Sequence, residues 1–488
     1  MAEEQLSAPE VKRRAVIGAV VDALRVSGVR LITVAGTIVI ARLLTPYALG
    51  LVTIGATVYA FGDFLDDGGV GVALIRRPEP PTKAELQALL AFQLGIDLLI
   101  VVAVGLVALP FGEVGRITTV VVCCLPFGAF RAPAYIIYER QLSYRPMAAA
   151  ELIQTCVYYA WGVGTVILGW GVWGLATAFV VRELTGSIVI LAVLPEGRML
   201  PVPSWTRIRG SLKFGVQVQA VGLLHMIRDQ GVNVLVAAFG GVAMLGLWGV
   251  AWRIIQLPVS LISALWRISL PGMAKLVAAK EDVGSTIERV IPLVAIGTGV
   301  LIVPLAASAE SWIHVLMGAQ WTGAASAIPG ACFAMAFGIP ISVALTGYLW
   351  AIGNSSVPMR ATAVGIPATL LVVAALEPLI GLTGVGIAYI ASSLVESIFF
   401  VVAARRTTSF RIGARLAVPV LAATGSWLCG WLVQRAIGPD LAGAVCASGV
   451  SLVAFVAVLA VAHRAYLTDA WTLVGRGLRG VTASPVTA

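Results

Sequence analysis

Charged residues are scarce in this sequence: Asp, Glu, Lys and Arg make up only 12% of its 488 residues. Soluble domains carry about 25%, so this chain has too little polar surface to be a soluble protein. An apolar content of 59% also excludes a disordered chain, a collagen and a disulfide scaffold. The apolar runs are unbroken for longer than the about ten alternating residues of a membrane β-strand. The composition therefore predicts an all-α polytopic membrane protein.

The few cysteines and three histidines do not suggest a metal site or a disulfide framework, because every cysteine lies in an apolar run without a histidine at ligand spacing. The sequence also lacks a Walker loop, a nucleophile elbow, an HExxH helix and a dinucleotide fingerprint. We therefore expect no cofactor, no metal and no enzymatic activity. The cysteines are Cys123, Cys124, Cys156, Cys332, Cys429 and Cys446.

What the sequence does contain is a series of long apolar runs. A helix needs about 20 residues to cross a bilayer, and fourteen runs reach that length. The start of the chain has no basic region or cleavage site, so we interpret the first run as an uncleaved span. The predicted spans are 15–43, 46–66, 84–110, 116–138, 146–168, 171–194, 210–239, 242–273, 288–309, 324–352, 358–377, 382–404, 414–433 and 441–463.

The fourteen spans are predicted to form two six-helix bundles, 15–194 and 210–404, with two additional helices in 405–465. The segment 195–209 is rich in Pro and Arg, a composition typical of a linker. Residues 1–14 and 466–488 complete the chain as a cytoplasmic N-terminus and a cytoplasmic tail. In the tail, apolar residues from Leu467 to Val481 recur at helical spacing, so it is either an amphipathic interfacial helix or disordered.

The positive charges set the predicted orientation. Most Lys and Arg residues outside the spans fall on one side, and the other side holds only Arg42, Arg116 and Arg435. Because basic loops stay in the cytoplasm, we expect both termini there. The net charge of +9 is spread over these loops, so it does not predict binding to nucleic acid.

Two pairs of segments suggest an internal repeat. Leu49-Gly50-Leu51 recurs as Leu245-Gly246-Leu247, 196 residues later, and both lie at a predicted outer turn. Gly171-Val-Trp-Gly174 recurs as Gly381-Leu-Thr-Gly384 at the start of the sixth and twelfth spans. Two bundles with an even number of helices enter the membrane from the same side, so the repeat axis should lie along the membrane normal. Such an arrangement favours a central cavity with alternating access.

Seven arginines lie within predicted spans, each at a cost of about 2.5–3.5 kcal/mol if it sits at mid-membrane. On the eighth span, Arg253, Gln256 and Arg267 fall within about 80° of one another, which predicts a polar face toward a cavity. A cationic cavity suits an anion, and guanidinium binds phosphate bidentately. The arginines are Arg25, Arg30, Arg131, Arg182, Arg228, Arg253 and Arg267.

We assign candidate residues on this basis. The predicted substrate-binding residues are Arg25, Arg30, Gln217, Arg228, Arg253 and Gln256. The predicted gating or ion-coupling residues are Asp22, Asp66, Asp67, Asp229 and Arg267.

Structural explanations stay open beside each assignment. Arg25 can pair with Asp22, Arg228 with Asp229 and Arg182 with Glu183; Arg267 can reach the membrane surface. The Gly68-Gly69 pair should end the second span, after which Asp66 and Asp67 can cap a short helix. The lone acids Asp97, Glu151 and Glu396 are each a candidate proton or sodium site.

The segment 43–77 resembles the polysaccharide-transport family of oligosaccharide flippases. The similarity is carried by Leu43, Leu44, Pro46, Gly50, Leu51, Asp67, Gly69, Gly71, Ala73, Leu74, Ile75 and Arg76. Residues 138–145, YERQLSYR, are similar to the loop that follows the fourth span in that family. The resemblance extends over at least 1–410, and the layout of six, six and two helices fits the multidrug/oligosaccharidyl-lipid/polysaccharide (MOP) exporter superfamily.

The resemblance implies a function. It implies a flippase that moves an undecaprenyl-pyrophosphate-linked oligosaccharide to the outer leaflet for cell-surface polysaccharide biosynthesis, without an ATPase of its own. Related lipid II flippases place arginines on the first and eighth spans, where Arg25, Arg30 and Arg253 lie here. Its partners would be the lipid-linked substrate, membrane lipids and a polymerase or ligase of the glycan pathway. The alternatives are a multidrug or cation antiporter of the same superfamily and a non-transporting scaffold.

Overall fold

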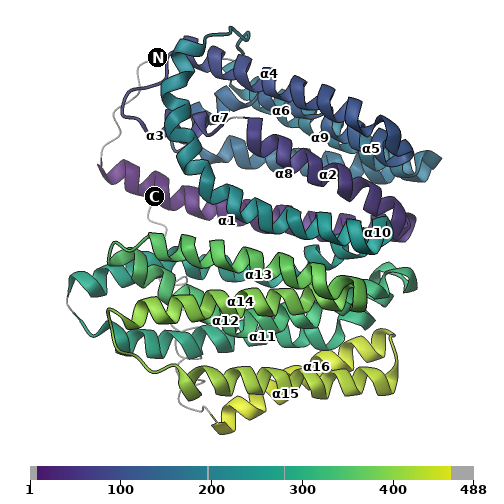
Figure 1. The fold of residues 1–488 in the computed structure, drawn as a ribbon, viewed down its shortest axis with the longest axis vertical. Helices are drawn as coiled ribbons and strands as arrows, with labels where there is room; N and C mark the ends of the chain where they lie inside the picture. Colours follow the sequence, from purple (N-terminus) through teal and green to yellow (C-terminus); the bar gives the residue numbers. More distant parts are fainter. Residues whose placement is uncertain (1–7, 67, 195–196, 280, 463–488) are drawn as a thin grey trace, which may run out of the picture. The chain divides into compact units, whose positions relative to one another are not determined.

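The computed structural model describes residues 8–66, 68–194, 197–279 and 281–462, with the side chains of 8–24 and of several α10 residues left out (Figure 1). The described residues form helices and the turns that connect them, and they contain no strand. The predicted all-α membrane fold is thus confirmed. The chain divides into two compact units, Met1–Val250 and Ala251–Ala488. The bundle boundary at 195–209 stays a prediction.

Unit 1 is built from long helices that pack side by side. α1 packs against α8, α8 against α9, and α2 against α5. The predicted span 116–138 is broken into three short helices, because Pro126 and Pro133 each begin a new one. The elements are α1 (Ala8–Leu43), α2 (Pro46–Asp66), α3 (Val70–Arg76), α4 (Lys83–Ala108), η1 (Leu109–Phe111), α5 (Gly112–Val122), α6 (Leu125–Ala129), α7 (Ala132–Arg140), α8 (Tyr144–Thr165), η2 (Val166–Trp170), α9 (Val172–Val193) and the first part of α10 (Trp205–Ala278).

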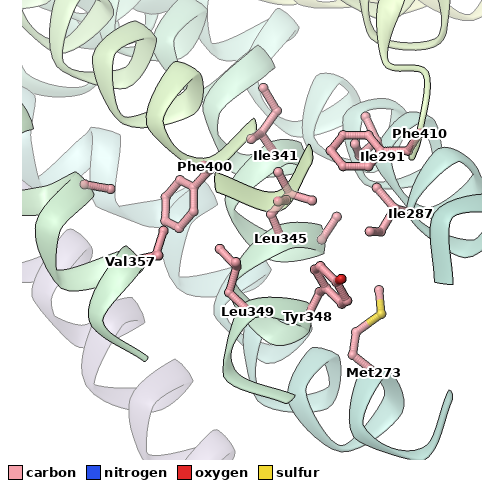
Figure 2. Packing of buried hydrophobic residues seen from close by; sticks show 13 residues of the cluster. Met273, Ile287, Ile291, Ile341, Leu345, Tyr348, Leu349, Val357, Phe400 and Phe410 are labelled. Atoms are coloured by element: carbon pink, nitrogen blue, oxygen red, sulfur yellow. The ribbon is translucent and has the colours of Figure 1, made fainter. Parts of the chain in front are cut away.

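Unit 2 contains the rest of α10 and seven further elements. The last two helices pack on each other and on α11, at one edge of the unit (Figure 1). A cluster of buried side chains around Leu345 and Tyr348 forms the main core (Figure 2). The elements are α11 (Val283–Met317), η4 (Ala319–Ala327), α12 (Ile328–Ala351), α13 (Ser356–Ile380), α14 (Leu382–Arg405), α15 (Gly413–Ile437) and α16 (Leu441–Ala462).

Twelve helical segments of the described chain are long and apolar enough to cross a membrane. Two of them, Lys83–Ala129 with 47 residues and Gly222–Ile262 with 41, would extend about 60–70 Å as single helices. That is twice the about 30 Å of a bilayer core. Each contains a glycine at positive φ, Gly112 at 56° and Gly241 at 81°, where the helix breaks. Each break lies between two predicted spans, and the total of fourteen stays a prediction.

The second pair of repeated segments adopts the same local structure in both units. Gly171 precedes α9 with φ 55° and ψ −133°, and Gly381 precedes α14 with φ 59° and ψ −142°. In both, the amide of the second glycine donates to the carbonyl of the first, Gly174 to Gly171 at 3.2 Å and Gly384 to Gly381 at 2.9 Å. Only glycine adopts this φ without strain. The repeat is therefore a repeat of backbone conformation.

The first pair of repeated segments meets in space, within unit 1. A Cβ atom on Gly50 would lie 1.9 Å from the carbonyl oxygen of Val242, and one on Gly246 would lie 1.9 Å from that of Pro46. An offset of 196 residues carries Gly50 onto Gly246 and Pro46 onto Val242. The two contacts are thus images of each other, which locates a pseudo-two-fold axis between them.

The segment that carries the family resemblance is held by backbone contacts. Gly68 and Gly69 have φ of 55° and 74°, so α2 ends at Asp66 as predicted. The N-cap of α3 is Gly69; Asp67 lies outside the described residues, and the predicted capping by Asp66 or Asp67 stays a prediction. Gly69 has no side chain to accept a hydrogen bond.

Arg140 ties this segment to the loop after α7. Its Nη1 donates to the carbonyls of Leu74, Ile75 and Arg77 at 2.7–3.1 Å, and its Nη2 donates to Pro78 at 3.1 Å. The end of α3 thus has its free carbonyls satisfied by one guanidinium. Beyond it, Arg77 donates two parallel hydrogen bonds to Glu85, at 2.7 and 2.5 Å. These bonds raise the pKa of Arg77 above its usual value.

Candidate functional site

The interior of unit 1 contains ion pairs between helices that are distant in sequence. Arg25 on α1 pairs with Glu151 on α8, 126 residues away, with both side chains about 30% exposed. Arg131, just before α7, pairs with Glu183 on α9, whose side chain is only 1% exposed. A buried pair compensates two charges that would otherwise be costly in a bilayer. These two pairs therefore fix α1 on α8 and α7 on α9.

Arg131 and Arg182 share one acid. Arg182 Nε lies 3.7 Å from Glu183, farther than Arg131 does, and is buried without a hydrogen-bond partner. The guanidinium of Arg131 also lies 5.8 Å from the centre of the Tyr135 ring, a cation–π distance. One carboxylate thus faces two guanidinium groups, and the excess positive charge lies beside α9.

Two further acids of unit 1 lie on the neighbouring helices α2 and α4. Asp63 on α2 is exposed and accepts a hydrogen bond from Tyr59 at 3.2 Å. Asp97 on α4 is fully buried, and neither of its carboxyl oxygens has a hydrogen-bond partner in the described residues. Gln93, one turn earlier, also has a buried oxygen without a partner. A buried polar group without a partner calls for an explanation.

The first part of α10 is tied to α2 by polar contacts. Asn233 donates to Thr57 at 3.1 Å and accepts from the indole of Trp248 at 2.9 Å. Gln219 donates to the carbonyl of Phe64 at 3.1 Å. These contacts hold the first part of α10 against α2.

The predicted substrate-binding arginines fall into two groups. Arg25 and Arg228 are engaged, the first with Glu151 and the second with Asp229 at 3.0 Å. Arg30 is half-buried and makes no ion pair or hydrogen bond to a described residue. Arg253, in unit 2, makes no ion pair with a described residue, and its Nη1 is buried without a hydrogen-bond partner. Arg30 and Arg253 thus carry charge that the described protein does not neutralise.

Several predicted residues are not brought together by the structure or lie beyond its description. The side chains of Asp22, Gln217 and Arg267, and residue Asp67, lie outside the described residues, as does the predicted tail helix. Gln256 is half-buried on α10, near Arg253 in sequence. Asp66 ends α2 and has a polar interaction of its own. The roles of all these residues stay predictions.

Sequence reasoning missed the pairing of Arg131 with Glu183 and the contact of Asn233 with Thr57. Arg131 and Glu183 are each visible in the sequence as a charge inside an apolar run, but 52 residues separate them. A helical pattern relates only residues three or four apart. The signal that could have found them is the rule that a charge inside a span has a partner.

The described residues do not contain a cluster of three or more His, Cys, Asp or Glu that could hold a metal ion. Unit 2 contains a cavity of about 440 Å³ between α11, α12, α14 and α15, with Phe333, Ile387 and Trp427 in its wall. Its wall is almost entirely apolar, which suits a hydrocarbon chain rather than a charged group.

Comparison with known proteins identifies the family. Residues 39–326 match the family model described as polysaccharide biosynthesis protein. Over 58% of its length the chain is 21% identical to lipopolysaccharide biosynthesis protein WzxC of Escherichia coli K12, and over 60% it is 22% identical to succinoglycan biosynthesis transport protein ExoT of Rhizobium meliloti. The alignments span about three fifths of these relatives, 59% and 60%.

Solved structures show the same fold. The lipid II flippase MurJ in an inward closed conformation superposes with a TM-score of 0.73 at 12% identity, over 93% of this chain and all of MurJ. An inward-facing multidrug resistance MATE transporter of the MOP superfamily gives 0.54 at 17% identity, over 78% of this chain and 94% of that one. The chain therefore shares its fold with these two transporters, and a multi-pass membrane protein is confirmed. With a family model matched over more than half of its length, the chain belongs to the polysaccharide biosynthesis protein family.

Proposed function

We propose that the chain is a flippase that carries an undecaprenyl-pyrophosphate-linked oligosaccharide across the cytoplasmic membrane by alternating access. Family membership supports a role in polysaccharide biosynthesis. The names of two relatives, a lipopolysaccharide biosynthesis protein and a succinoglycan transport protein, support export of a glycan. The shared fold with a lipid II flippase is consistent with a lipid-linked cargo. We infer transport without an enzymatic step, with both termini in the cytoplasm.

The observation that carries the proposal is the state of Arg30 and Arg253. Both lie in membrane-spanning segments and neither is neutralised by a described residue. A guanidinium cannot lose its proton in a protein, so its charge must be met by something else. A pyrophosphate supplies two adjacent phosphates, each able to accept two parallel hydrogen bonds from arginine. The other predicted substrate-binding residues would line the site without adding a charge that lacks a partner. They are Arg25, Arg228, Gln217 and Gln256.

The test is export in cells. Deleting the gene should trap lipid-linked oligosaccharide on the cytoplasmic face of the membrane. We expect Arg30→Gln and Arg253→Gln, each expressed at the normal level, to restore surface glycan at least about tenfold less well than the wild type, since a charge-assisted hydrogen bond contributes about 1.5–3 kcal/mol. Arg116→Gln is the matched control, because Arg116 is exposed on α5.

Three outcomes would overturn the proposal. Normal export by Arg30→Gln and Arg253→Gln would remove these residues from the site. Unchanged surface glycan in the deletion strain, together with altered drug sensitivity, would support a multidrug antiporter. Unchanged glycan and unchanged drug sensitivity would support a scaffold. Mass spectrometry of lipids co-purified with the protein would identify the saccharide.

A further inference from the structure

α2 and α4 place two acids at the same level. A Cβ atom built on Gly62 would lie 3.5 Å from Ile100 Cγ2, and one built on Gly68 would lie 3.6 Å from Phe92 Cε1. Residue numbers rise along one helix as they fall along the other, so the two helices are antiparallel. Asp63 follows Gly62 directly, and Asp97 comes three residues before Ile100. The contacts therefore bracket both acids and put them opposite each other.

The two acids differ sharply in exposure. Asp97 is 0% exposed and both of its carboxyl oxygens lack a partner in the described residues, whereas Asp63 is exposed. A carboxylate ion at Asp97 would be a buried charge without compensation, which a protein avoids by keeping the group neutral. Asp63 is close enough to act electrostatically on Asp97. A second negative charge nearby makes an ionised Asp97 still less favourable.

Among the described residues, no lysine or arginine pairs with Asp97. The elements packed against α4 are α2, α5, α6, α7 and η1, and the segment before α10 contacts its first turns, where Val202 donates to the carbonyl of Gln87 at 3.2 Å. α6 and η1 contain no charged residue, α5 holds Glu113 and Arg116 in its first turns, and α7 holds Glu139 and Arg140 in its last turn. Cys124, just before α6, is a buried thiol.

The neighbouring charges act on Asp63 instead. Glu183, Arg131 and Arg182 all act electrostatically on Asp63, and Tyr59 donates a hydrogen bond to it. Arg131 and Arg182 are already engaged with Glu183. The pair thus has a fully buried member, Asp97, and an exposed member, Asp63, that lies near other charges.

We propose that Asp97 and Asp63 form a proton-binding site in which Asp97 holds the proton and Asp63 receives it on release. In this conformation the proton is on Asp97. Release follows a movement of α4 that exposes Asp97: the O–H bond of Asp97 breaks, an O–H bond forms on the Asp63 carboxylate, and Asp63 then passes the proton to water. Asp97 is left ionised only after α4 has exposed it to solvent. If the chain is the flippase proposed above, this proton is its coupling ion; the proton site itself does not depend on that function.

Infrared spectroscopy of the purified full-length protein in lipid, without cargo, tests the site. At pH 7 we expect the wild type to show the carbonyl stretch of a protonated carboxyl group that Asp97→Asn loses, one group per chain. Glu79→Gln, in the exposed loop after α3, should keep it. Asp63→Asn should lose the band at a lower pH than the wild type, because the negative neighbour that disfavours an ionised Asp97 is removed. Identical wild-type and Asp97→Asn spectra at pH 7 would overturn the proposal.

A second measurement separates the site from the proposed function. In proteoliposomes, a pH gradient should accelerate flipping of lipid-linked oligosaccharide by the wild type, and Asp97→Asn should lose that acceleration. If the wild type flips no such lipid but shows the Asp97 band, the proposed function fails and the proton site stands. If Asp97→Asn keeps the full response to the gradient, the role of Asp97 as the coupling site is overturned.

Discussion

The interiors of the two units are stabilised in different ways. In unit 1, Arg25–Glu151 and Arg131–Glu183 join helices across the membrane interior. In unit 2, the main core is a cluster of 13 buried side chains in which the only hydroxyl, that of Tyr348, donates to Thr407 at 3.0 Å (Figure 2). Beside its apolar clusters, the first interior contains charged groups that each need a partner, whereas the core of the second is mainly packed apolar side chains. The difference predicts how each unit responds to substitution.

The largest effect is expected where an ion pair is broken from one side. Arg131→Met leaves Glu183 buried without its nearest cation, a loss of about 3–5 kcal/mol. Arg131→Met with Glu183→Leu removes both charges of this pair but leaves Arg182 without its acid, so it should recover only part of that loss. The measurement is the unfolding transition of the purified protein in mixed micelles.

A matched control uses Arg116, which is exposed on α5. Arg116→Met should unfold like the wild type. If Arg131→Met proves as stable as Arg116→Met, the ion pair does not stabilise unit 1, and the contrast between the units disappears.

The next effect tests the apolar interior. Leu345 is 0% exposed at the centre of the cluster in unit 2, so Leu345→Ala opens a cavity and costs about 2–5 kcal/mol. Leu371→Ala on α13 is the control, because Leu371 is 69% exposed and touches little protein. The same unfolding transition measures both. Leu345 has no charged partner, so no second substitution can rescue Leu345→Ala as Glu183→Leu partly does for Arg131→Met. Equal stability of the two leucine variants would contradict the assignment of a packed core.

The existence of the helices could be predicted from the sequence because each needs only an apolar run of sufficient length. The helix breaks at Gly68-Gly69 and before Gly171 and Gly381 could be predicted as well, since glycine marks them locally. The division of 116–138 into α5, α6 and α7 follows from Pro126 and Pro133, but the sequence does not say whether a proline kinks a helix or ends it.

The site could be predicted less well than the fold. Arg228–Asp229 was accessible because the residues are adjacent, and it is confirmed as an ion pair. Arg25 has a partner 126 residues away in Glu151, which no helical spacing indicates. The orphaned state of Asp97 depends on which helices surround α4, and that is a property of packing.

The smallest effect compares glycine contacts in the two units. Gly50→Ala would place its Cβ 1.9 Å from the carbonyl oxygen of Val242, whereas Gly299→Ala would place its Cβ 2.2 Å from the ring of Phe455. Overpacking lowers stability by about 1–3 kcal/mol. We expect Gly50→Ala to destabilise the protein more than Gly299→Ala, because a backbone carbonyl cannot move aside by changing rotamer as a side chain can. Gly95→Ala, with no atom within 4 Å, should cost nothing by sterics.

A second substitution distinguishes the two contacts. Phe455→Leu shortens the side chain that meets position 299, so in the Gly299→Ala background it should recover part of the lost stability. Val242→Ala in the Gly50→Ala background should recover little, because the carbonyl oxygen that blocks the new Cβ remains in place. Comparable rescue in both backgrounds would mean that α2 can move away from α10, and that the joint at the pseudo-two-fold axis is adjustable. Rescue of Gly299→Ala alone would mean that unit 1 is fixed by its backbone where unit 2 adapts through its side chains.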